Sequence, residues 1–417
     1  MDRKGVNYDV GLVMGANWRP DYNPAVVHRE LEIIRTGLHC NTVRIRARDI
    51  RRLAGAAEDA LAQGLEVWFS PELWNKNPDA TLRYISRAAA AAEDLRARWP
   101  GRLVFSVGNE LTFFMRGITP GHTFNQRIRR ASMELIRSRA YDKPLNAFLA
   151  RASQAVREIY GGPVTYASLP FEHVDWDMFD LIAVNHYWRE PVKDRYLRTL
   201  EPLLASGKPV VITELGFRTR TGADHTGPAG PENLAPLSWA LHLLPVTQPF
   251  IRPRVKTIHE RNEELQARSL TRQLELLDNA GADGAFVHTF TAPLFPCADD
   301  PRHDLDTDSF SLVKPYPGSH GTTYPDMAWE PKQVFGALAA AYARPLGQER
   351  VSPRQSPTGS APVTTWAYGP PAPALAASET TTDCRSRLPG SGVEVGLRPA
   401  QDEMSELSKL PVRVGGA

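Results

Sequence analysis

The stretch RLVFSVGNE, residues 102–110, ends an apolar run on a carboxylic acid. Its β-branched and aromatic residues predict a strand that is buried on both faces, as in a parallel sheet. A buried carboxylate needs a partner or a chemical task, and no Lys or Arg lies between residues 103 and 115. Glu110 is therefore a candidate functional residue, and its role depends on what the other strands carry at the same level.

Similar runs alternate with longer amphipathic segments along the chain. The predicted strands are residues 10–15, 41–47, 65–71, 102–110, 163–169, 180–188, 209–217 and 283–290. Helical patterns between and after them include residues 24–36, 50–62, 80–99, 262–280 and 331–344. This alternation predicts a parallel sheet, and eight units predict a single closed (β/α)8 barrel. No Gly-x-Gly-x-x-Gly motif follows the first strand, which argues against a dinucleotide-binding fold.

The connections between the predicted elements differ at the two ends of the barrel. The helix-to-strand connections are short and carry glycines suited to helix C-caps, at positions 37, 64, 101, 161, 162, 207, 281 and 284. Long strand-to-helix loops follow strands 4, 7 and 8, over residues 112–125, about 218–260 and 291–330. Insertions therefore gather at the carboxyl ends of the strands, where barrel enzymes build their sites.

Composition changes sharply near residue 345. Residues 345–417 are rich in Pro, Ser, Thr and Gly and have few periodic apolar positions. Such a segment cannot bury enough apolar surface to offset the entropy of ordering it. We therefore predict a barrel domain over residues 1–344 and a disordered tail over residues 345–417.

The charge and the cysteine content of the chain argue against several classes of partner and site. A formal net charge of +2 in 417 residues gives no field suited to nucleic acid or an anionic membrane. The three cysteines form no CxxC pair and indicate neither a disulfide framework nor a zinc site. No run of 18 or more apolar residues occurs, and residues 1–10 lack the apolar core of a signal peptide. We expect a cytoplasmic protein with no nucleic-acid or membrane partner.

Polar residues fall at the carboxyl ends of several predicted strands. Glu110, preceded by Asn109, ends strand 4, and Glu214 ends strand 7 in VITELGF. The remaining candidates are Arg44 on strand 2, Asn185, His186 and Tyr187 on strand 6, and His288 on strand 8. The two carboxylates are thus expected at one level, on roughly opposite sides of the barrel.

The motifs NTVRI, GNE, VNHY and TELG, in this order on strands 2, 4, 6 and 7, resemble those of the clan A retaining glycoside hydrolases. The resemblance covers most of residues 10–344 and implies a carbohydrate substrate and no cofactor. It makes Glu110 the general acid/base and Glu214 the nucleophile. It also implies that Asn109 holds a substrate 2-hydroxyl, that Arg44 keeps Glu214 ionised, and that Tyr187 hydrogen-bonds the nucleophile.

Two positions depart from the pattern of that clan. Its members commonly have Pro after the strand 4 Glu, where this chain has Leu111. Many end strand 8 on a Trp that floors the sugar subsite, whereas VHTFTAP leaves Phe290 or His288 for this task. Trp18 and Trp74, just past strands 1 and 3, offer faces for stacking on sugar rings or serve as loop anchors.

Two further patterns in the sequence bear on its function. Asp304, Asp306 and Asp308 mimic calcium-loop spacing, but Ser309 and Pro315 stand where Gly and Glu are required. We therefore expect a solvated loop, or at most a sugar-binding acid, and no metal site. The segments DLDTDSFSLVKPYPG and YPDMAWEPK faintly resemble bacterial proteins described as abortive phage infection proteins. The alternative function is a non-catalytic barrel that binds a glycan or a partner, with a role in phage defence.

Overall fold

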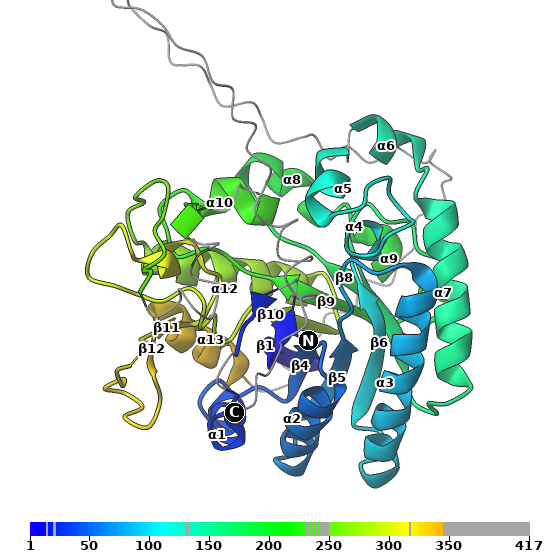
Figure 1. Cartoon of the computed structure of the whole chain (residues 1–417), viewed down its shortest axis with the longest axis horizontal. Helices are drawn as coiled ribbons and strands as arrows, with labels where there is room; N and C mark the ends of the chain where they lie inside the picture. Colours follow the sequence, from blue (N-terminus) through cyan, green and yellow to red (C-terminus); the bar gives the residue numbers. More distant parts are fainter. Residues whose placement is uncertain are drawn as a thin grey trace, which may run out of the picture.

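The computed structural model forms a closed barrel of eight parallel strands surrounded by helices (Figure 1). It describes residues 1–13, 16–19, 22–130, 133–229, 233–235, 237–238, 241, 250–316 and 318–344. The predicted tail over residues 345–417 lies outside the described residues. The predicted (β/α)8 barrel is confirmed.

The barrel strands occur in sequence order around the barrel, and β10 closes on β1. They are β1 (Arg3–Asp9), β4 (Thr42–Ala47), β5 (Glu66–Pro71), β6 (Leu103–Asn109), β7 (Val164–Ser168), β8 (Ile182–Asn185), β9 (Val210–Leu215) and β10 (Gly284–Val287). Two small antiparallel sheets lie outside the barrel: β2 (Leu12–Val13) with β3 (Ala16–Asn17), and β11 (Val313–Pro315) with β12 (Trp329–Pro331).

The helices fall into a set of long ones and a set of short ones. The long helices are α1 (Pro24–Thr36), α2 (Ile50–Ala62), α3 (Pro78–Arg98), α7 (Asp142–Arg157), α12 (Glu263–Asn279) and α13 (Gln333–Tyr342). The short ones are α4 (Leu111–Phe114), α5 (Phe124–Arg130), α6 (Met133–Ser138), α8 (Lys193–Tyr196), α9 (Glu201–Leu204) and α10 (Ala223–Thr226), with 3-10 turns η1 (Trp176–Met178), η2 (Glu190–Val192), η3 (Gly227–Ala229) and η4 (Leu305–Asp308). The predicted helices 24–36 and 50–62 coincide with α1 and α2, whose first turns are capped by the side chains of Asn23 and Asp49.

The prediction for the first strand was wrong. The barrel strand is Arg3–Asp9, and part of the predicted segment 10–15 forms the small strand β2 instead. Asn7 and Asp9 alternate with the apolar residues of β1, so the strand lacks the continuous apolar run that identified the others. Gly5 fits because the strand passes close to β10: a Cβ there would lie 2.5 Å from Phe286 Cδ1.

Inside the barrel, side chains change from apolar to charged toward the carboxyl ends of the strands. Trp68, Val211 and Phe286 belong to a buried apolar cluster. Two residues further along the same strands, and therefore on the same face, stand Ser70 and Thr213. The charged groups described below lie at this polar level and above it.

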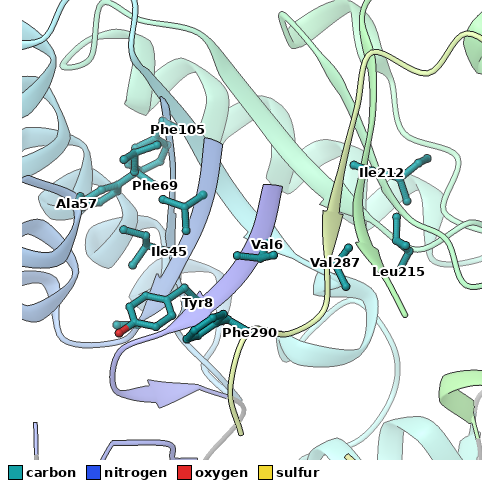
Figure 2. Close-up of a cluster of buried hydrophobic side chains, with 14 of the residues drawn as sticks. Val6, Tyr8, Ile45, Ala57, Phe69, Phe105, Ile212, Leu215, Val287 and Phe290 are labelled. Atoms are coloured by element: carbon teal, nitrogen blue, oxygen red, sulfur yellow. The ribbon is translucent and has the colours of Figure 1, made fainter. Parts of the chain in front are cut away.

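The outward faces of the strands form the main core with the helices (Figure 2). Each fully buried large apolar side chain there contributes roughly 1.5–3 kcal/mol relative to exposure. The core residues drawn include Val6, Tyr8, Ile45, Ala57, Phe69, Phe105, Ile212, Leu215, Val287 and Phe290.

The long loops follow β6, β9 and β10, as predicted. The loop after β6 extends further than the predicted 112–125, because α4, α5 and α6 precede the barrel helix α7. In Figure 1, α5, α6, α8 and α10 lie along the upper edge of the view, away from α1 and α2 at its lower edge. None of the helices formed by the described residues combines the length and the apolar character that a bilayer crossing requires.

Candidate active site

Glu214, at the end of β9, accepts hydrogen bonds from two guanidinium groups. Arg46 Nη1 lies 2.7 Å and Arg44 Nη1 lies 3.1 Å from Glu214 Oε1, and the Tyr187 hydroxyl donates to Oε2 at 3.0 Å. Burial alone would raise the pKa of Glu214, but the charges of Arg46 and Arg44 outweigh it and hold the pKa well below its ordinary value. The Glu214 carboxyl is therefore ionised at neutral pH.

The two guanidinium groups come from alternate positions of β4 and are themselves fixed. Arg46 donates to both oxygens of Asp9, from Nε at 2.6 Å and from Nη2 at 2.8 Å. Arg44 is fully buried and donates from Nε to Ser70 Oγ at 3.1 Å and from Nη2 to Asn109 Oδ1 at 3.0 Å. Such charge-assisted bonds hold the cations in place against the carboxylate of Glu214.

Glu110 lies in surroundings of the opposite kind. Its Oε1 accepts a hydrogen bond from Asn185 Nδ2 at 2.7 Å, and no Lys or Arg forms an ion pair with it among the described residues. Burial, together with the negative charge of Glu214, raises the pKa of Glu110 well above its ordinary value. The Glu110 carboxyl is therefore protonated in the state in which Glu214 is ionised.

The backbone of Glu110 adopts φ 45° and ψ 45°, the left-handed region that non-glycine residues rarely enter. A hydrogen-bonded chain holds the turn that follows. Leu111 N donates to the Tyr166 hydroxyl at 2.7 Å, and that hydroxyl donates to Glu172 Oε2 at 2.9 Å. Thr112 N donates to Glu172 Oε1 at 3.1 Å. The Leu111 that departs from the clan pattern thus supplies an N–H group that proline lacks.

Irregularities in strand register bring the site residues together. The pairing of β6 with β7 shifts between Ser106 and Asn109, and that of β8 with β9 shifts between Val184 and Asn185. As a result Asn185 pairs with Glu214, while its side chain reaches Glu110. Asn185 therefore bridges the two carboxyl-bearing strands.

Comparison with known proteins bears on the fold. No family model matches the chain, and no curated protein matches it. Two solved structures of a GH113 β-1,4-mannanase are similar to it at 14% identity, with TM-scores of 0.51 and 0.52, over 82% of this chain and 99% of theirs. A β-glucuronidase of Bacteroides uniformis is similar at 14% identity and a TM-score of 0.50, over 82% of this chain and 35% of the other.

This chain shares the (β/α)8 barrel fold of these enzymes. The resemblance stated from the strand motifs agrees with this finding at the level of the fold. The fainter resemblance to abortive phage infection proteins is not tested by it and stays a prediction.

Within the barrel, one connected set of hydrogen bonds joins the predicted residues Arg44, Asn109, Glu110, Asn185, Tyr187 and Glu214. His288 is partly buried near Glu214, and its buried Nδ1 atom has no hydrogen-bond partner. Burial lowers the pKa of His288, so its imidazole is neutral.

Four other predicted residues lie outside this set of hydrogen bonds. His186 stacks on Tyr196 with ring centroids 4.2 Å apart, and burial lowers its pKa to about 4. Phe290 is fully buried in the main core, between Tyr8 and Trp329. Trp18 stacks on Phe295 at 5.7 Å, while Trp74 packs against Phe124 and lines a pocket that also reaches Asn109.

Sequence reasoning missed Arg46, Asp9, Glu72 and Glu172. Arg46 stands two residues after Arg44 on one strand, so strand periodicity alone places both on the same face. Asp9 was missed because the first strand was placed too late in the sequence. Glu72 directly follows β5, and this position is a signal that was available. Glu172 lies in a loop after β7, and nothing in the local sequence indicates its contacts.

The Asp304–Asp308 segment is buried, so the prediction of a solvated loop was wrong. Among the described residues, Cys297, Asp304 and Asp306 are close enough to share a metal ion. Arg261 already contacts all three: Nη2 lies 2.8 Å from Asp304 Oδ1 and 3.3 Å from Cys297 Sγ, and Nη1 lies 2.9 Å from Asp306 Oδ2. The guanidinium group occupies the place a metal would need, so these residues do not fit a metal site.

Proposed function

We propose that this protein is a retaining glycoside hydrolase that cleaves β-linked sugars by double displacement. The observation that supports the proposal is the pair of carboxyl groups at the carboxyl ends of β6 and β9, bridged through Asn185 and Asn109 to Arg44, whose pKa values shift in opposite directions, down for Glu214 and up for Glu110. Acetal cleavage through an oxocarbenium-like transition state requires one protonated and one ionised carboxyl group in this way. The barrel fold shared with glycoside hydrolases is consistent with it.

In the first step Glu110 donates its proton to the glycosidic oxygen while Glu214 attacks the anomeric carbon. The Tyr187 hydroxyl and the two guanidinium groups orient the Glu214 carboxylate for this attack. Asn109 Oδ1 accepts from both Arg44 and Asn185, which leaves its amide nitrogen to donate to a sugar hydroxyl. The product of this step is a covalent glycosyl ester of Glu214.

In the second step Glu110 acts as a base toward water. Esterification removes the negative charge of Glu214, and that charge is one cause of the high pKa of Glu110. The pKa of Glu110 therefore falls in the intermediate, where an ionised carboxylate is required. Water attacks the anomeric carbon, Glu110 accepts its proton, and the sugar leaves with its original configuration.

A panel of activated 2-fluoro-sugars, followed by peptide mass spectrometry, tests this proposal. We expect at least one β-configured reagent of the panel, neutral or anionic, to leave its sugar covalently bound to Glu214. Turnover of aryl β-glycosides is measured in parallel. Glycan binding without labelling and without turnover would replace the proposal with the non-catalytic binding barrel.

A further inference from the structure

Glu72 directly follows β5 at the same end of the barrel as Glu110 and Glu214. Its side chain is only 8% exposed, and its Oε1 atom has no hydrogen-bond partner. The nearest cation is Arg46, whose Nη1 lies 3.7 Å away and donates to Glu214 Oε1 at 2.7 Å. Burial, only partly offset by Arg46, raises the pKa of Glu72 to about 7. The proposed reaction gives this carboxyl group no task.

Trp74, two residues after Glu72, carries a second unpartnered polar atom. The indole Nε1 of Trp74 is buried and has no hydrogen-bond partner. Glu72, Trp74 and Asn109 line one pocket, so the acceptor of Glu72 and the donor of Trp74 adjoin a residue of the proposed site. Buried polar groups are normally satisfied, so an open acceptor and an open donor on two residues that line one pocket suit a ligand hydroxyl, which can both donate and accept.

The charges around Glu72 favour an uncharged ligand. Every nitrogen of Arg44 and Arg46 already donates to a protein group. The carboxyl groups of Asp9, Glu72 and Glu214 share these two cations. The positive charge of the two guanidinium groups is therefore already shared among three carboxyl groups. A substrate carboxylate beside Glu72 would compete with these groups for the same cations and would be repelled by ionised Glu72.

We propose that Glu72 and Trp74 form a binding subsite for one hydroxyl group of a neutral sugar, and that Glu72 discriminates against uronic acids. This inference rests on the proposed glycosidase function and adds the substrate class to it. The sugar hydroxyl donates to Glu72 Oε1 and accepts from Trp74 Nε1. An anionic sugar loses this contact and gains repulsion.

The test combines deoxy substrates with variants of Glu72. Aryl β-glycosides of the sugar that the wild type cleaves best are compared with analogues lacking one ring hydroxyl each. In the wild type, removal of one particular hydroxyl is expected to lower kcat/KM at least about 100-fold, because it leaves buried polar groups unpaired. In Glu72→Ala that same removal is expected to change kcat/KM less than about threefold, because the acceptor is already gone.

Glu172→Gln is the matched control, since Glu172 is also a buried carboxyl group near the proposed site but does not line this pocket. It should keep the wild-type pattern of deoxy penalties. Glu72→Gln keeps the shape of the side chain but removes its negative charge. This variant should therefore lower the ratio of kcat/KM for an aryl glucoside to kcat/KM for the matching glucuronide. If Glu72→Ala keeps every wild-type deoxy penalty, or if the wild type prefers the glucuronide, the inference is wrong.

A different result would show that the proposed glycosidase function itself is wrong. In that case the wild type cleaves no glycoside in the panel, and the same comparison is made with dissociation constants of neutral oligosaccharides measured by titration calorimetry. Loss of one hydroxyl contact in Glu72→Ala would then still support the subsite. Equal affinities of wild type and variant for every deoxy analogue would overturn it.

Discussion

The surroundings of Glu214 and of Glu110 differ in where their hydrogen-bond donors come from. Glu214 faces two arginines from one strand, and each is fixed by further side chains. Glu110 faces the neutral amide of Asn185, and the chain that holds its backbone turn ends on another carboxylate, Glu172. The charge of the nearest hydrogen-bond donors therefore decides the protonation state of each glutamate. Cationic donors keep Glu214 ionised, whereas a neutral donor leaves Glu110 protonated at the same end of the barrel.

Replacement of Glu214 by Gly is expected to have the largest effect, a fall in kcat of about 10⁴-fold or more, because no nucleophile remains. Azide should restore turnover and give the α-glycosyl azide, since the small anion fills the vacated space. Product configuration is measured by NMR. Azide should leave the wild-type product unchanged, and a wild-type product of inverted configuration would contradict double displacement.

Replacement of Glu110 by Ala should lower kcat/KM by about 10²- to 10⁴-fold for substrates with poor leaving groups, which need protonation. For dinitrophenyl glycosides, whose leaving group needs no protonation, the rate of the glycosylation step should fall much less. Azide should then react with the covalent intermediate in place of water and give the β-glycosyl azide. Rates are measured over a series of leaving-group pKa values. Equal losses across that series would remove Glu110 from the acid role.

Arg44→Met should move the acidic limb of the kcat/KM profile to higher pH by about one unit. Loss of a cation disfavours ionised Glu214, so its pKa rises and protonation inactivates the enzyme at a higher pH. Arg48→Met, at an exposed position on the same segment, is the matched control and should leave the limb in place. An unmoved limb in a folded Arg44→Met variant would separate Arg44 from the ionisation of Glu214.

Glu172→Gln should have the smallest effect, a downward move of the basic limb by less than about one unit. The negative charge of Glu172 contributes to the high pKa of Glu110, so its removal lowers that pKa and the acid is lost at a lower pH. Tyr166→Phe removes the hydroxyl but keeps the charge, and should move the limb less. An upward move in Glu172→Gln would show that its charge does not act on Glu110.

The barrel could be predicted because most of its strands are continuous apolar runs. β5, β6 and β9 are buried on both faces, and such strands are visible in a single sequence. β1 carries Asn7 and Asp9 toward the interior and was therefore misplaced. The same polar residues that hid the strand hold Arg44 and Arg46.

The candidate site was predictable where strand ends carried recognisable motifs, as at Glu110 and Glu214. It was not predictable where contacts join distant segments: Thr112 and Glu172 are 60 residues apart. Residue type and strand position also suggested His186 and Phe290, whose rings pack against Tyr196 and Trp329 in the protein core. The direction of a side chain at a strand end depends on register shifts that the local sequence does not reveal.

The hydrogen bond from Leu111 N to the Tyr166 hydroxyl carries an evolutionary consequence. A proline at position 111 would leave the oxygen of that hydroxyl without its N–H donor, although the hydroxyl could still donate to Glu172. A lineage therefore cannot exchange proline and leucine here one residue at a time without passing through a poorly satisfied intermediate. Positions 111, 166 and 172 are expected to covary among homologues, with Tyr and Glu retained together wherever the residue after the strand-end Glu is not proline.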